Sequence, residues 1–355
     1  MRATTQREAL LKTLGKVKSA VVARPTLPVL SNILIRAGGG ELTLTATDLE
    51  VALTASCKAK VTRQGAIAVL PKTLEAFLKA VKDEKVALSI VDKNRLKVEA
   101  GAITTLEGFE AQDYPSVPGV KGKAIVVVTG LADALKQISY AMARDEAARP
   151  ALSGAYFASE NGSMVLTATD GYRLAETKVR AKEQIEPTIV PAKAIQFIEK
   201  LMPGKVSIHR VKKAKVRPTI SFVGEGLVLT AMVIESKFPN YKHLIPQNGS
   251  PLTLEKKALQ SALDIVKVTL PGNNAVRLQT RSGKLIISTN SDEGNTEVKV
   301  PAKGKAMIAF DINYLKDVLA RSSEKFIMRT SSPQNPVAIR QNGTVHVLMP
   351  MANQW

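Results

Sequence analysis

Three stretches of the chain share one spacing of apolar residues, and they begin at Leu10, Leu131 and Leu259. In each stretch apolar residues stand at relative positions 0, 4, 7 and 11, with mostly polar or small residues between them. Because one face of an α-helix has this spacing, each stretch predicts an amphipathic helix.

After each of these three predicted helices, a second helix is predicted further along the chain. Apolar residues at relative positions 0, 3, 4 and 7 begin at Leu74 and at Ala194, each three residues after a proline. Proline is tolerated in the first turn of a helix, so Pro71 and Pro191 are expected to start these two helices. In the last third of the chain, Asp311 is placed to cap a corresponding helix.

Short alternating runs rich in Val, Ile and Thr separate the helices and predict antiparallel strands. Examples are Val86–Val91, Leu96–Val98, Leu227–Val233 and Val345–Met349. Gly38, Gly39 and Gly40 are expected to form a turn between two strands. The pattern as a whole is that of an α+β protein.

The chain repeats itself at an interval of about one third of its length. Leu44–Asp48 recurs unchanged as Leu166–Asp170, 122 residues later, and a weaker copy, Ile287–Ser291, follows after another 121. Because both helical patterns recur at nearly the same interval, we predict three tandem domains. Each has two helices packed on antiparallel sheets, and the expected bounds are 1–120, 125–245 and 250–355, with linkers near 115–123 and 246–251.

The net charge of the chain indicates what kind of partner the protein binds. The chain has 355 residues, of which 50 are Lys or Arg and 31 are Asp or Glu, so its formal net charge is +19. With 45% hydrophobic residues it can also bury a sizeable core. A folded protein with this charge is expected to bind a polyanion, and nucleic acid is the first candidate. Aromatic residues are sparse, which favours backbone contact with duplex over stacking on single strands.

Other classes of protein find little support in the sequence. Cys57 is the single cysteine and the histidines are scattered, so neither a disulfide nor a metal site is expected. No apolar run approaches the roughly 18 residues of a membrane span, and the polar N-terminus has no secretory core. A reduced intracellular setting is expected, with no membrane partner and no cofactor.

Asp48 and Asp170 are candidates for paired metal-binding carboxylates, as in a nuclease. They end equivalent copies of one repeat, and the third copy has Ser291. A shared metal site is not expected to occupy equivalent places in separate domains. The two residues are therefore interpreted as turn carboxylates, and the protein as one that binds rather than catalyses.

Several long motifs resemble one family over the whole chain. Arg24–Ile33 and Thr47–Glu50 are similar to motifs of the first domain of the bacterial sliding clamp, the β subunit of DNA polymerase III. Ala168–Ala175 is similar to its second-domain motif, and Phe238–Tyr241 and Val347–Met351 match as well. The motifs stand in the family's order and at its spacing.

This resemblance implies a head-to-tail homodimer whose six domains close into a ring around double-stranded DNA. Helices would line the hole, and an outer sheet would run across the subunit boundaries. The implied function is that of a processivity factor in DNA replication, without catalysis, in the cytoplasm at the nucleoid. The implied partners are a DNA polymerase catalytic subunit, a clamp loader ATPase and other proteins that carry a clamp-binding motif.

The resemblance also implies three sets of site residues. The cations expected to face DNA are Arg24, Arg149, Lys12, Lys72, Arg144 and Lys193. The pocket expected to bind partner peptides comprises Thr169, Gly171, Tyr172, Arg173, Leu174, Pro239, Leu244, Tyr314, Val337, Val347, Met349, Pro350 and Met351. The dimer interface is expected near Ile103 and Leu106 in the first domain and near Val268 and Leu270 in the third.

Two features depart from the family pattern. The family is usually acidic overall, whereas this chain is strongly basic and carries a cluster of cations within residues 205–217. We therefore hypothesise a divergent or accessory clamp with direct electrostatic binding outside the hole. The alternative is a non-encircling basic scaffold that binds DNA. The chain also extends past Met351 to Trp355, which could cover the pocket or be a frayed end.

Overall fold

The computed structural model describes residues 1–120, 123–213 and 216–351. Lys215 of the basic cluster and the terminal residues through Trp355 lie outside these ranges. The chain forms two compact units. The first contains Met1–Ala132, Ala181–Glu183 and Lys193–Val233, and the second contains Asp133–Arg180, Gln184–Ala192 and the chain from Ile234 onward.

A twelve-stranded antiparallel sheet belongs to the first unit, in the order β1-β6-β7-β8-β5-β2-β3-β4-β16-β15-β14-β9. Its strands are β1 (Arg2–Gln6), β2 (Ile33–Gly38), β3 (Glu41–Thr47), β4 (Val51–Arg63), β5 (Gly65–Val69), β6 (Lys85–Asp92), β7 (Arg95–Ala100), β8 (Ala102–Glu110), β9 (Val126–Thr129), β14 (Lys205–Lys213), β15 (Val216–Gly224) and β16 (Leu227–Met232). Because β1 also pairs with β4, the first eight strands of the order close on themselves. Gly38–Gly40 forms the expected turn between β2 and β3.

The second unit contains an eight-stranded and a four-stranded sheet. The larger has the order β13-β10-β11-β12-β24-β23-β22-β17 and the smaller β20-β19-β18-β21. Their strands are β10 (Gly154–Glu160), β11 (Ser163–Thr169), β12 (Arg173–Arg180), β13 (Thr188–Pro191), β17 (Ser250–Glu255), β18 (Ala275–Arg281), β19 (Lys284–Ser291), β20 (Gly294–Pro301), β21 (Met307–Asp311), β22 (Lys325–Thr330), β23 (Val337–Gln341) and β24 (Thr344–Leu348).

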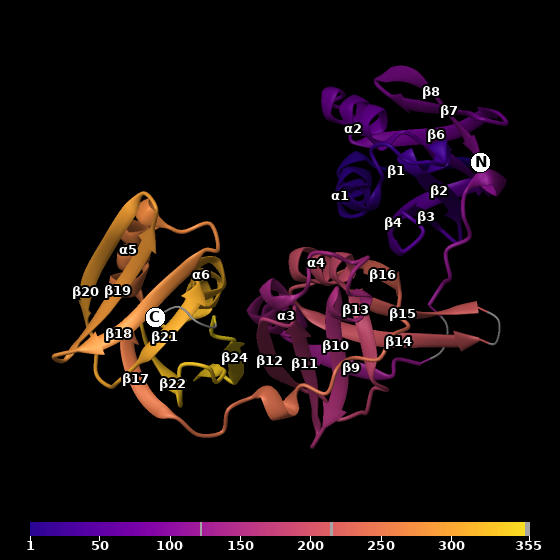
Figure 1. Ribbon diagram of the computed structural model, residues 1–355. Coiled ribbons are helices and arrows are strands. Elements are labelled where there is room, and N and C mark those ends of the chain that lie inside the picture. The colour runs from indigo at the N-terminus through magenta and orange to yellow at the C-terminus, as the bar shows by residue number, and fades with distance from the viewer. Residues whose placement is uncertain (121–122, 214–215, 352–355) are drawn as a thin grey trace. The chain divides into compact units, whose positions relative to one another are not determined.

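Six α-helices lie in the described residues, where the apolar spacing predicts them. They are α1 (Arg7–Val17), α2 (Pro71–Ala80), α3 (Leu131–Ile138), α4 (Ala192–Leu201), α5 (Lys256–Val266) and α6 (Ile312–Arg321). Leu10, Leu135 and Leu263 are fully buried, so the apolar face of each first helix is its core face. The helices α1 and α2 pack side by side, as do α5 and α6 (Figure 1).

The second helices begin where the sequence predicts in two of the three cases. Pro71 is the first residue of α2, and the Asp311 carboxylate caps α6 by accepting hydrogen bonds from the backbone N–H of Asn313 and Tyr314. Pro191 is instead the last residue of β13, opposite Gly154, and α4 starts one residue later. Proline is accepted at this strand end because the next N–H, that of Ala192, donates to the Ser153 carbonyl.

Candidate functional site

The turn after β11, which follows the second copy of the repeated pentapeptide, is held by hydrogen bonds within the turn itself. The Asp170 carboxylate accepts hydrogen bonds from the N–H groups of Tyr172 and Arg173, at 2.9 and 3.0 Å. The Thr169 hydroxyl donates to the Arg173 carbonyl and accepts from the N–H of Gly171, whose φ is 93°. Glycine suits this left-handed conformation. The interpretation of Asp170 as a turn carboxylate is confirmed.

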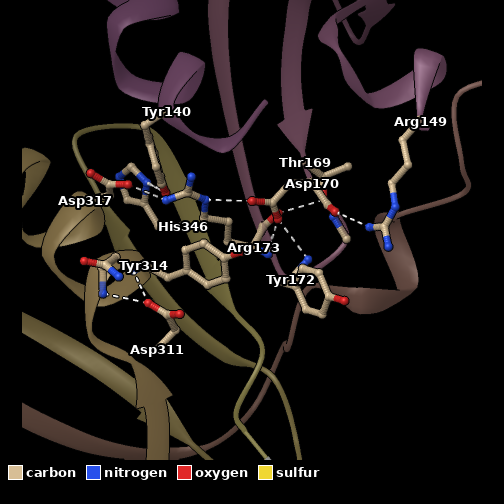
Figure 2. A network of polar contacts seen from close by, with 12 residues as sticks. Tyr140, Arg149, Thr169, Asp170, Tyr172, Arg173, Asp311, Tyr314, Asp317 and His346 are labelled. Carbon is tan, nitrogen blue, oxygen red and sulfur yellow. Dashed lines mark hydrogen bonds and ion pairs between the residues drawn. The ribbon is translucent and has the colours of Figure 1, made fainter. Parts of the chain in front are cut away.

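Arg173 joins this turn to α6. Its guanidinium donates to Asp170 at 3.0 Å and to Asp317, and its side chain is 4% exposed (Figure 2). The same guanidinium lies 4.4 Å from the ring centre of Tyr314 and 5.2 Å from that of Tyr140. Two carboxylates and two aromatic faces thus replace the water that a buried guanidinium loses.

A second layer of this network lies behind Arg173. The Tyr140 hydroxyl and Nδ1 of His346 are 2.9 Å apart, and Arg321 covers the Tyr140 ring at 4.4 Å. Arg321 also donates to the carbonyls of Lys136 and Asp317. Burial raises the pKa of the Tyr140 hydroxyl and lowers the pKa of His346 to about 4. His346 is therefore neutral in the folded protein near pH 7.

The buried neutral His346 predicts an acid-sensitive stability. An unfolded histidine takes up a proton below its ordinary pKa of about 6.5, whereas folded His346 resists protonation until about pH 4. Between these values the unfolded state binds more protons, so stability falls by up to about 3 kcal/mol as the pH drops through the window. Denaturant unfolding at pH 7 and pH 5 measures this loss. The His346→Gln variant is expected to lose less stability between pH 7 and pH 5 than the parent protein. An equal loss in both proteins contradicts the role of His346.

A cavity of about 940 Å³ opens beside the turn. Its walls are formed by Met142, Ala143, Arg144, Asp145, Ala148, Arg149, Asp170, Tyr172, Arg173, Asp311, Asn313, Tyr314, Lys316 and Asp317. Tyr172 is 53% exposed and stacks on Tyr314, with ring centres 6.2 Å apart. Arg149 lies over the Tyr172 ring and donates to the Asp170 carbonyl at 2.6 Å. The cavity offers exposed aromatic faces between charged groups of both signs.

The other residues predicted for the peptide pocket divide into buried supports and accessible ones. Leu174 and Val347 lie in a buried cluster with Phe238, Tyr241 and Ile245, and Val337 is fully buried in a neighbouring core. Pro239 and Leu244 are exposed, and Met349, Pro350 and Met351 are partly buried. The N–H of Met349 donates to the Tyr172 carbonyl at 2.8 Å, which fixes Met349 beside the turn.

Four members of the polar network were not anticipated from the sequence: Tyr140, Asp317, Arg321 and His346. Asp317 and Arg321 stand four residues apart on a predicted helix, which is a weak sign of a paired face. Tyr140 and His346 are 206 positions apart, and their contact depends on packing that no local pattern reveals.

All six cations predicted to face DNA are exposed. Arg144 and Arg149 line the cavity just described, so both are also available to a peptide bound there. Lys193 forms an ion pair with Asp48, so the Asp48 carboxylate partly neutralises the charge that Lys193 could offer to DNA. Lys12, Lys72 and Arg24 lie on α1, α2 and the segment after α1. Their role in DNA binding stays a prediction.

The described residues of the basic cluster lie on two paired antiparallel strands, β14 and β15. Pro218 lies inside β15. Its carbonyl accepts a hydrogen bond from the N–H of Val233, so the missing N–H of proline leaves this link intact.

The predicted interface residues differ in exposure. Ile103 on β8 is 64% exposed and Val268, in the 3-10 turn after α5, is 76% exposed. Leu106 is buried in its own domain, and Leu270 packs against the core of the last domain. Ile103 and Val268 are therefore the apolar side chains available for association.

Within the described residues, no helix is long and apolar enough to cross a membrane.

The three parts of the chain match three models of one family. Residues 1–118, 126–240 and 242–352 match the N-terminal, central and C-terminal domains of the DNA polymerase III beta subunit. A beta sliding clamp of Pseudomonas putida is 31% identical over 99% of this chain and 100% of its own length. A beta sliding clamp of Caulobacter vibrioides is 32% identical with the same coverage.

Solved structures agree with the sequence comparison. The DNA polymerase III subunit beta of Pseudomonas aeruginosa has a TM-score of 0.90 and 28% identity, over 99% of this chain and 100% of the other. A sliding clamp of Bartonella birtlesii bound to griselimycin has a TM-score of 0.89 and 29% identity, with the same coverage. The fold is thus that of three tandem clamp domains. The chain belongs to the DNA polymerase III beta subunit family, the bacterial sliding clamps.

Proposed function

We propose that the chain closes as a head-to-tail homodimeric ring around duplex DNA and tethers a replicative polymerase to its template. The observation that carries this proposal is the full-length similarity to sliding clamps over all three domains. We propose domain bounds of 1–120, 125–245 and 250–355, and the matched ranges support them. The proposed place of action is the nucleoid, in the cytoplasm.

Duplex is held by topology and guided by charge in this proposal. Exposed cations on the helices give phosphates an attraction that is nearly independent of position and sequence. Such a surface lets DNA slide, while the closed ring prevents its escape. Neither task requires a catalytic group.

Two sheet edges support closure of the ring. In the described structure β20 is the last strand of its sheet, and residues 102–107 of β8 pair with β7 on one side. Open edges of this kind can continue a sheet into a second subunit. Exposed Ile103 and Val268 supply apolar contact. A repeated heterologous contact closes when its rotation divides a full circle.

The proposed partners beyond DNA are a polymerase catalytic subunit, a clamp loader ATPase and other proteins with a clamp-binding motif. We place their common site at the turn after β11 and the segment Met349–Met351. Methionine side chains adapt to different apolar partners, which suits one site used in turn by several proteins. The exposed Tyr172 ring is the most accessible apolar surface there.

The Tyr172→Ala variant is expected to bind purified DNA polymerase III catalytic subunit at least about tenfold more weakly, because an exposed aromatic anchor is removed. Surface plasmon resonance with immobilised clamp measures the change. Ile327→Ala, which truncates a comparably exposed apolar residue on β22, serves as the control. Equal affinity of Tyr172→Ala and the control contradicts the proposed site.

We also propose direct electrostatic binding of DNA outside the hole of the ring, which the net charge of +19 favours. The full-length similarity to sliding clamps supports an encircling ring over a non-encircling scaffold. Direct binding through the paired strands β14 and β15 would add to retention on DNA and would weaken steeply with salt. Retention on nicked circles during a salt titration measures this extra grip. A slope no steeper than that of an acidic clamp contradicts it.

A further inference from the structure

A second groove, of about 410 Å³, lies within the first compact unit. Its walls come from the turn between β3 and β4, from the segment after β8 and from β15 and β16. Leu49, Pro115, Val117 and Met232 provide apolar surface, and Arg217 provides a cation. The motif Thr47–Glu50 forms part of these walls, but the proposed function does not use the groove.

The turn at this groove repeats the hydrogen bonds of the peptide-site turn. The Asp48 carboxylate accepts from the N–H groups of Glu50 and Val51, at 3.0 and 2.7 Å. The Thr47 hydroxyl donates to the Val51 carbonyl and accepts from the N–H of Leu49. These are the bonds that Asp170 and Thr169 make in the second copy.

The neighbouring strand repeats as well. The N–H of Met232 donates to the Glu50 carbonyl at 2.9 Å, just as the N–H of Met349 donates to the Tyr172 carbonyl at 2.8 Å. Each turn is therefore bordered by a methionine that ends or follows the adjacent strand. The duplicated sequence has produced two grooves of one backbone design.

The backbone of Leu49 has a conformation that is unfavourable for a residue with a side chain. Its φ is 81°, where the second copy has Gly171 at 93°. A left-handed conformation costs a residue with a side chain roughly 1–2 kcal/mol relative to the right-handed one. Burial does not offset this cost, since Leu49 is 44% exposed. A strained, exposed leucine on a groove wall is typical of a contact made with a ligand.

Charge identifies the chemistry of that ligand. Arg217 is exposed, and its guanidinium contacts the Met232 sulfur at 3.7 Å. Among the described residues, Arg217 has no carboxylate partner, whereas Lys193 nearby is paired with Asp48. Glu50 on the rim is also exposed and disfavours a ligand that is acidic throughout. An apolar side chain beside a single carboxylate is complementary to this surface.

We propose that this groove binds a short extended peptide segment of a partner protein, with an aliphatic or aromatic side chain against Leu49 and Met232 and a carboxylate on Arg217. The clamp would then hold two peptides per subunit, one at each copy of the turn. The inference rests in part on the peptide site proposed above, because the two grooves share their design.

The test uses the full-length protein with carbon-13-labelled methionine methyl groups. The probe is the peptide acetyl-Asp-Leu-Phe-amide, and nuclear magnetic resonance follows Met232 for the new groove and Met349 for the other site. The Met232 signal is expected to shift and to saturate. Leu49→Asn is expected to weaken this binding about tenfold while changing affinity at Met349 less than twofold. Asparagine tolerates positive φ, so the turn is retained.

Arg217→Gln, on an exposed strand position, is the second variant. It is expected to weaken binding at Met232 about fivefold for the acidic probe and to leave acetyl-Asn-Leu-Phe-amide unchanged. A shift at Met349 with none at Met232 overturns the inference and leaves the proposed function standing. A shift at Met232 alone supports the inference and counts against the other site. Shifts at Met232 caused by duplex DNA or by protein concentration, without peptide, overturn the peptide as the occupant.

Discussion

Arg173→Ala is expected to destabilise the second compact unit by about 3 kcal/mol. The substitution leaves the Asp170 carboxylate, whose side chain is 12% exposed, without its guanidinium partner. It also removes the cation between the Tyr140 and Tyr314 rings. Truncating one member of a buried pair is destabilising because the remaining charge stays desolvated. Denaturant unfolding followed by circular dichroism measures the loss.

Two further variants provide reference values for the destabilisation by Arg173→Ala. Arg173→Lys keeps the charge but loses the planar fork that reaches both carboxylates, so an intermediate loss is expected. Lys178→Ala removes a solvent-exposed ion pair with Glu160, and a loss below about 1 kcal/mol is expected. If Arg173→Ala costs no more than Lys178→Ala, the network does not stabilise this unit in the way described.

Ile103→Asp combined with Val268→Asp is expected to open the ring. Both side chains are exposed in the single chain, so each subunit should stay folded, whereas an interface would bury two unpaired carboxylates. The expected result is a monomer in sedimentation and at least an approximately 100-fold shorter lifetime on circular DNA.

Ile327→Asp is the matched control, since Ile327 is similarly apolar and exposed but lies on β22, in the eight-stranded sheet and not in the four-stranded sheet that has β20 at its edge. The Ile327→Asp variant should remain dimeric and keep its normal lifetime on circular DNA. A double variant that sediments as a dimer with normal retention contradicts both the placement of the interface and its role in confining DNA.

The spacing of apolar residues predicted most of the helices and strands, because each of these elements buries one face and the spacing marks that face. The spacing that begins at Leu10, at Leu131 and at Leu259 marks the core face of α1, α3 and α5. The capping role of Asp311 also follows from its type and place, since its carboxylate accepts the free N–H groups of the first turn. Pro191 misled the prediction because proline is tolerated both at a helix start and at a strand end.

The candidate site was predictable as a motif but not as a network. The repeated pentapeptide marks both turns, and the family resemblance places a peptide pocket at the second one. The partners of Arg173 come from α3 and α6 regions far away in sequence, and only folding brings Tyr140 and Asp317 to one guanidinium. The repeat marks the turn at Leu49 but not the groove, whose cation, Arg217, is brought there by strand pairing.

The most direct measurement places the protein on closed circular duplex and then cuts the circle at one site. A closed ring is expected to stay on the closed circle at moderate salt and to slide off the free ends as soon as the circle is cut. Equal dissociation from closed and cut DNA would show that the protein holds duplex by surface charge alone, and would contradict a ring that confines it.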